Sequence, residues 1–262
     1  MGLRKSVLAA SLAALFLTAS ADAALYWNDE FNYADGDLTV YDGAGDDVSG
    51  GLWSPHSGTG FATSVEVVSG QAILRQGNPA SEDVNRLSGS TLGAGETLYA
   101  SMIISVEDLR GGTELFNGDE IYFAHFYSSF KSRVHLRDGS DSNHYTLGLS
   151  GSSGAPAAEW GSDLSFDTQY QVIFSYEFDT GISKLWVNPA SEGDTSISDV
   201  SSASVGLTGV ALRQDFISGA DHAVVSVDAV ALGSDFASVL PEPASLALLA
   251  LGGVSLLRRR KA

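Results

Sequence analysis

Basic side chains gather in one short stretch of an otherwise acidic chain. Four of them stand at every second position of residues 131–137: Lys131, Arg133, His135 and Arg137. Successive side chains of a β-strand point to opposite faces, so this spacing predicts a basic face, with Val134 and Leu136 directed into a core. A row of guanidinium groups suits uronic or sulfated sugars, whose oxyanions accept paired hydrogen bonds.

The preceding stretch, residues 121–127, supplies aromatic partners for this basic face. Its alternation predicts that Ile121, Phe123, His125 and Tyr127 share one face of a strand. If the two strands pair, a polar and aromatic patch forms, and we expect its ligand-binding residues to be His125, Tyr127, Arg133, His135 and Arg137. The alternative is that the arginines pair with neighbouring carboxylates such as Glu107 or Glu177, which contributes little to stability and binds nothing.

No arrangement of residues in the sequence indicates catalysis. Retaining glycoside hydrolysis needs two carboxyl groups on one strand face. Of the nearest acid clusters, Asp119-Glu120, Glu107-Asp108 and Glu177 with Asp179, only the last places two acids on one face at a spacing of two. They stand beside Thr180 and Gly181, where acids commonly serve a turn. The five histidines show no zinc-protease spacing, and no serine stands in a G-x-S-x-G turn. We therefore expect a protein that is not an enzyme.

Two acidic loops, residues 35–37 and 42–47, could supply oxygen ligands for calcium. Neither follows the EF-hand pattern, so plain turns are the alternative.

Alternating apolar and polar residues recur along the middle of the chain and predict its strands. The expected strands cover residues 65–74, 98–106, 121–128, 132–137, 145–149, 170–178, 184–188 and 223–232. Clusters of Gly, Asp, Asn and Ser separate them, and the chain has no convincing long amphipathic helix. The pattern predicts an all-β fold, an antiparallel sandwich or barrel.

Three segments resemble the concanavalin A-like (laminin G-like) jelly rolls of exported bacterial proteins. They are the opening DEFNY of residues 29–33, the LWVNP of residues 185–189, and the VDAVALG of residues 227–233. The resemblance implies an antiparallel two-sheet jelly-roll sandwich, with ligands held on its concave sheet. It also implies a structural calcium ion near Asp29 and Asp228. Because this fold hosts lectins, structural domains, hydrolases and lyases, it leaves the activity open, and the E-x-D-x-x-E strand of laminarinases is missing.

The first 23 residues predict a secretory signal peptide that forms a short helix. Two basic residues precede an apolar run over 7–17, and the small residues Ala21 and Ala23 fit cleavage by signal peptidase after residue 23. A permanent membrane helix is the weaker alternative, since the run is too short to cross a bilayer.

The last 22 residues predict a sorting tail. Pro241, Glu242 and Pro243 precede a charge-free helix over 244–257 and a basic cluster that contains Arg258, Arg259 and Arg260. This order resembles the PEP-CTERM signal of Gram-negative bacteria. The resemblance implies processing by an exosortase, a membrane-embedded protease, transient anchoring in the inner membrane by 244–257, and delivery to the cell surface or extracellular matrix.

Between the two ends, residues 24–240 form the expected domain. They carry 8 basic and 30 acidic residues, because six of the 14 Lys and Arg but only two of the 32 Asp and Glu lie in the ends. Such a charge repels nucleic acid and excludes it as a partner. The chain has no cysteine, so disulfides and thiolate metal sites are excluded. We expect an exported polysaccharide-binding or structural protein, with a carbohydrate-active enzyme as the alternative.

Overall fold

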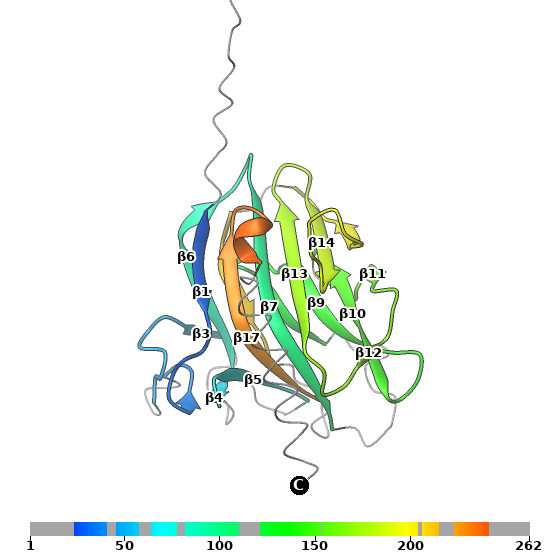
Figure 1. Cartoon of the computed structure of the whole chain (residues 1–262). Coiled ribbons are helices and arrows are strands. Elements are labelled where there is room, and N and C mark those ends of the chain that lie inside the picture. Colours follow the sequence, from blue (N-terminus) through cyan, green and yellow to red (C-terminus); the bar gives the residue numbers. More distant parts are fainter. Residues whose placement is uncertain are drawn as a thin grey trace, which may run out of the picture.

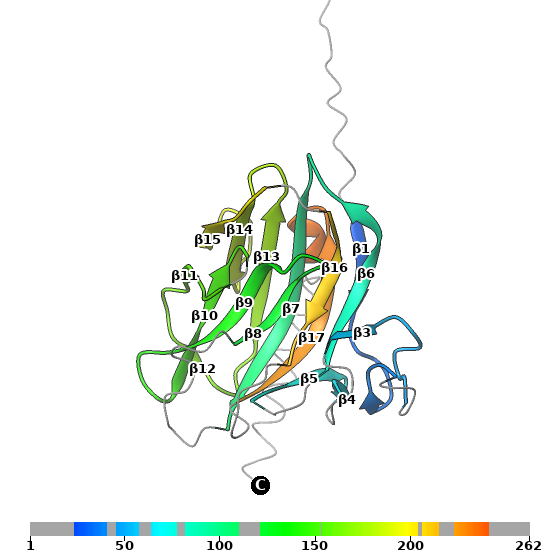
Figure 2. The ribbon, with the colours of Figure 1, turned by 180° about the vertical axis from the view of Figure 1, so that it is seen from behind.

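Two antiparallel sheets face each other across the core (Figures 1 and 2). This computed structural model describes residues 24–40, 46–57, 64–77, 82–109, 121–152, 154–203, 206–214 and 223–240. The architecture confirms the expected all-β antiparallel sandwich. The signal peptide and the apolar tail helix lie outside the described residues.

The first sheet has nine strands. In spatial order its main path runs β15 (Ile197–Val200), β14 (Ile182–Val187), β13 (Tyr170–Glu177), β7 (Thr97–Asp108), β17 (Ala223–Gly233), β5 (Gln71–Gln76), β4 (Glu66–Val68) and β2 (Gly36–Asp37), and β1 (Leu25–Asp29) pairs with β17. Because β5 pairs with the first half of β17 and β1 with its second half, the two strands share one edge of β17.

The second sheet has eight strands. In spatial order its main path runs β11 (Ala158–Glu159), β10 (His144–Ser150), β9 (Lys131–Asp138), β8 (Tyr122–Tyr127), β16 (Leu207–Leu212), β6 (Asp83–Leu92) and β3 (Ser54–Ser57), and β12 (Leu164–Ser165) pairs with β10. The pairing of β8 with β16 joins residues that are far apart in the sequence, and it places the basic strand β9 near the middle of this sheet.

The core forms because alternate side chains of each sheet point at the other sheet. Phe126 of β8 and Phe174 of β13 meet across the core with ring centroids 4.7 Å apart, and both are fully buried. An aromatic pair of this kind contributes about 0.5 to 1.5 kcal/mol beyond the burial of its area. The two sheets thereby bury the apolar positions that the sequence pattern indicated.

A small second cluster lies on the other face of the nine-stranded sheet. The short helix η1 (Ala237–Val239) covers it after β17, as Figure 1 shows. Phe236 packs edge-on against Trp186 and Tyr99, and the Ser101 hydroxyl donates to the Val239 carbonyl at 2.6 Å. The chain is therefore held on the sheet up to residue 240.

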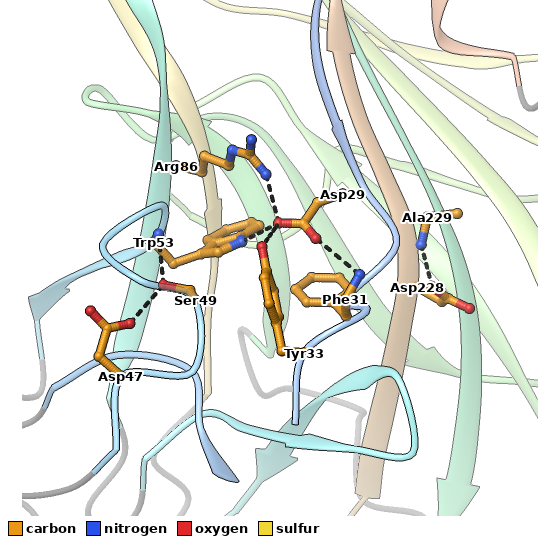
Figure 3. A network of polar contacts seen from close by, with 9 residues as sticks. All are labelled: Asp29, Phe31, Tyr33, Asp47, Ser49, Trp53, Arg86, Asp228 and Ala229. Carbon is orange, nitrogen blue, oxygen red and sulfur yellow. Dashed lines mark hydrogen bonds and ion pairs between the residues drawn. The ribbon is translucent and has the colours of Figure 1, made fainter. Parts of the chain in front are cut away.

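The carboxylate of Asp29 joins three parts of the chain at the end of β1 (Figure 3). It accepts hydrogen bonds from the Phe31 amide at 2.9 Å, the Tyr33 hydroxyl at 2.7 Å, the Trp53 indole at 2.8 Å and the Arg86 guanidinium at 2.6 Å. Four donors satisfy a buried carboxylate that would otherwise be costly. Asp29 thus fixes the opening segment against β6 and the loop before β3.

Among the described residues, no helix has the length and apolar character that crossing a bilayer requires.

We predict that Asp29→Asn lowers the free energy of unfolding by about 3 kcal/mol, because it leaves a buried guanidinium without its counter-ion. Urea denaturation at pH 7 measures the loss. Glu159→Gln is the matched control: Glu159 pairs with Arg137 at the surface, and its loss costs under about 1 kcal/mol. Equal effects of the two changes would refute the role of Asp29.

Candidate functional site

The predicted basic strand is β9. Over most of its length, its side chains alternate between the core and the opposite face of the sheet, as predicted. Val134 and Leu136 belong to the core cluster, whereas Arg133 and His135 do not. His135 pairs with Gly148 of β10 and with Tyr122 of β8, and Arg133 pairs with Ser150 of β10. These residues lie on the outer face of the eight-stranded sheet, which faces away from the nine-stranded sheet.

Lys131 leaves this face, which corrects the prediction for that residue. Phe130 and Ser132 on either side of it have left-handed φ values of 55° and 52°, and the pairing of β8 with β9 is irregular here. An irregularity of this kind shifts the alternation of side chains. The Lys131 amine therefore turns towards Ser201 and Tyr176 and away from Arg133.

The alternation predicted for β8 is also wrong in its first half. Ile121 and Phe123 belong to the core cluster, whereas His125 and Tyr127 do not. The register shifts around Ala124, so that Phe123 and Ala124 both join the core, and Tyr122 shares the outer face with His125. A one-residue shift reverses the face of every residue that follows it, which a pattern read along one strand cannot reveal.

Aromatic and basic side chains meet on the outer face. The guanidinium carbons of Arg133 and Arg213 lie 4.4 and 4.1 Å from the centroid of the Tyr122 ring. His125 stacks on Phe130 with ring centroids 4.9 Å apart. Cations over aromatic faces are stabilised by the ring quadrupole, so an acidic protein holds two arginines here on aromatic rings.

Three of these residues were missed by the sequence analysis. His56 of β3 lies beside Tyr127, with ring centroids 5.0 Å apart, and the Tyr122 ring lies next to the guanidinium groups of both Arg133 and Arg213. His56 and Arg213 are far from residues 121–137 in the sequence, and only the pairing of β16 with both β6 and β8 brings them close. Tyr122 could have been found from the neighbouring aromatic run, had the shift in β8 been recognisable.

The three histidines of this face are neutral at physiological pH. Burial, reinforced by the charge of Arg213, lowers the pKa of His56 to about 4. Burial is also the main cause that lowers the pKa of His125 and His135 to about 3, and nearby arginines add to it. Neutral imidazoles each offer one donor and one acceptor nitrogen.

Several ring nitrogens of these histidines are buried and have no hydrogen-bond partner among the described residues. They are Nε2 of His125, Nδ1 of His135 and both nitrogens of His56. His125 is 1% exposed, and its Nδ1 lies 3.0 Å from the Phe126 carbonyl, which can only accept. The proton therefore sits on Nδ1 and leaves Nε2 as an acceptor for a hydroxyl group. Buried polar atoms normally have partners, so these nitrogens are available to a bound group or to water.

Arg137 is on the outer face but is engaged elsewhere. Its Nε donates to Glu159 at 2.9 Å, in an ion pair whose carboxylate is half exposed. For this residue the alternative interpretation, pairing with a surface carboxylate, describes the contact, although the partner is Glu159 and not Glu107 or Glu177.

The acids considered for hydrolysis serve a turn. Glu177 accepts a hydrogen bond from the Thr180 hydroxyl at 2.8 Å, and Asp179 accepts one from the Gly95 amide at 2.9 Å.

Asp29 does not fit a calcium ligand. Both of its oxygens accept hydrogen bonds, and four donors surround them (Figure 3). In the described ranges, no group of three or more His, Asp or Glu side chains is placed to hold a metal ion. Asp228 lies in the irregular part of β17, where its Oδ1 accepts from the Ala229 amide at 2.7 Å. Of the acidic loops, residues 41–45 lie outside the described residues.

The end of the chain matches a known family. Residues 239–261 are a PEP-CTERM protein-sorting motif. This motif indicates export, transient anchoring in a membrane through the C-terminal tail, and processing by exosortase, a membrane protease. The predicted sorting residues are Pro241, Glu242, Pro243, Arg258, Arg259 and Arg260. They lie within the match but outside the described residues. The predicted cleavage residues Ala21 and Ala23 also lie outside the described residues.

Three solved structures illustrate what the chain resembles in shape. The carbohydrate recognition domain of Emp47p is 10% identical, with a TM-score of 0.48 over 82% of this chain and 97% of that one. The alginate lyase AlgAT5 of polysaccharide lyase family 7 is 13% identical (TM-score 0.49, 77% and 94% covered). Arcelin-5, a lectin-like defence protein of Phaseolus vulgaris, is 8% identical (TM-score 0.41, 80% and 97% covered). No curated protein matches the sequence.

We predict that Asp228→Asn stabilises the protein at neutral pH by about 1 to 2 kcal/mol, a value that allows for partial solvent screening. Burial, with the charges of Glu30 and Asp29, raises the pKa of Asp228 to about 6. A raised pKa in the folded state means that protonation stabilises the fold at low pH, and that this stabilisation is lost as the pH rises through 6.

The advantage of Asp228→Asn should therefore shrink from pH 8 to pH 5, as measured by urea denaturation in a chelating buffer. A variant that is less stable than the parent at pH 8 in the chelating buffer would refute the prediction. If calcium raises the Tm of the parent and not that of the variant, the calcium site is favoured instead.

Proposed function

We propose that this exported protein binds an anionic polysaccharide, with uronic acid units, through the outer face of its eight-stranded sheet. The observation that carries the proposal is the group of Arg133 and Arg213 over Tyr122, beside histidines with buried ring nitrogens that have no hydrogen-bond partner in the described part of the chain. The guanidinium groups suit a carboxylate. The neutral imidazoles suit hydroxyl groups, and a uronic acid carries both.

The side chains of the outer face differ in their exposure, and we therefore assign them different roles in binding. Tyr127, His56 and Arg213 are partly exposed and Phe130 is 43% exposed, so these side chains can meet a ligand first. His125 and His135 are almost fully buried among them. They are therefore suited to hold a group that enters between the rings, or to position the rings themselves.

Binding without catalysis is favoured over the enzyme alternative by the state of the histidines. A general base works best when its pKa lies near the operating pH, and a histidine with a pKa of about 3 accepts a proton poorly at pH 7. We propose the cell surface or extracellular matrix of a Gram-negative bacterium as the destination, because the sorting motif belongs to exported proteins. An acidic polysaccharide of that matrix would be the ligand.

We predict that Arg133→Ala and Arg213→Ala each weaken binding to a uronic acid polymer by about 10-fold or more, which corresponds to the loss of one charge-assisted hydrogen bond. The exported protein is applied to a glycan array with calcium and with chelator, and positive signals are quantified by titration calorimetry.

Arg75→Ala is the matched control, because Arg75 pairs with Glu66 on the nine-stranded sheet and its loss changes the net charge equally. No binding to any acidic glycan would refute the proposal, and unchanged binding by both outer-face variants would move the site elsewhere. Circular dichroism verifies that each variant is folded.

A further inference from the structure

Lys131 is a buried residue whose amine has no counter-ion among the described residues. It is 4% exposed, and among the described residues no carboxylate forms an ion pair with it. In the described ranges its amine donates to neutral oxygens: the Ser201 hydroxyl at 3.0 Å, and the carbonyl and hydroxyl of Ser202 at 3.3 and 3.4 Å. An ammonium group in such surroundings loses hydration without gaining an opposite charge, which favours the neutral amine.

The residues around Lys131 also favour a neutral amine, and the backbone beside it is strained. Burial lowers the pKa of Lys131, and its amine lies 5.6 Å from the centroid of the Tyr176 ring. The backbone on both sides is in a region that costs energy for residues other than glycine, since Phe130 and Ser132 have positive φ. Such strain persists only where the surrounding structure enforces it, and it is common at functional sites.

Ser201 is held in place opposite the amine. Its amide donates to the Gly181 carbonyl at 2.9 Å, and the Tyr176 hydroxyl donates to the carbonyl of Ser202 at 2.9 Å. Gly181 allows this close approach, because a Cβ there would lie 2.2 Å from the Ser201 carbonyl oxygen. Ser201 is only half-buried, so its hydroxyl lies between a buried amine and the surface.

We propose that Ser201 and Lys131 form a nucleophile and base pair that accepts an acyl group from a small oxygen ester. In the structure Lys131 Nζ donates to Ser201 Oγ at 3.0 Å, and Ser201 Oγ donates to the Gly181 carbonyl at 3.4 Å. When the amine releases its proton, the Ser201 hydroxyl can turn and donate to Nζ across the same contact. This site is separate from the outer face, since Lys131 turns away from Arg133, so the proposal does not depend on polysaccharide binding.

The step balances without a cofactor. Ser201 Oγ forms a bond to the ester carbonyl carbon, and its proton moves to Lys131 Nζ. The bond between that carbon and the ester oxygen then breaks, and the departing alkoxide takes the proton from the Lys131 ammonium. The products are an alcohol and an acyl group on Ser201, with no change in oxidation state.

The test uses p-nitrophenyl acetate as the acyl donor and the exported protein as the acceptor. Release of nitrophenolate is followed in a stopped-flow instrument, and mass spectrometry locates the acetyl group. We expect acetylation of Ser201, and a burst rate that falls at least about 100-fold in Ser201→Ala and in Lys131→Met, as for the loss of a nucleophile or its base.

Three controls keep the proposal falsifiable. Ser202→Ala removes the neighbouring hydroxyl and should keep the burst. Lys131→Arg keeps a buried cation but supplies no base, so this variant should stay folded and lose the burst. Near-UV circular dichroism and glycan binding report on the fold independently. Acetylation confined to Lys131 or to other serines, or an unchanged burst in Ser201→Ala, would overturn the proposal and leave the proposed polysaccharide site unaffected.

Discussion

The packing of the two sheets against each other decides where every polar side chain of the middle strands goes. Each strand must give alternate side chains to the core, so the remaining ones form the outer face. Irregular pairing between β8 and β9 breaks this alternation near Ala124 and Ser132. The first shift puts Tyr122 beside His125 and His135, and the second directs Lys131 towards Ser201. Both proposed sites therefore follow from one constraint and its local exceptions.

The protein places its few basic residues where they are buried or paired. Arg86 meets the Asp29 carboxylate, Arg133 and Arg213 lie over Tyr122, and Arg137 meets Glu159. Arg213 also lies 3.8 Å from the Asp83 carboxylate, so the aromatic ring of Tyr122 and a carboxylate together hold this arginine in place.

Sorting and binding belong to different parts of the chain. The PEP-CTERM motif begins at residue 239, where η1 is still held on the nine-stranded sheet through Phe236 and Ser101. The outer face lies on the other sheet (Figures 1 and 2). The start of the sorting motif and the outer face are therefore associated with different sheets.

The sequence by itself determined the all-β class, the positions of most strands and the sorting motif, because these depend on local periodicity and on short contiguous signals. It also identified His125, Arg133 and His135 as members of one face. It did not reveal His56 and Arg213, which join that face only through pairings between distant strands. Nor did it show that Asp29 is saturated by donors or that Lys131 faces Ser201. Those facts depend on register and on long-range contacts, which only the tertiary structure decided.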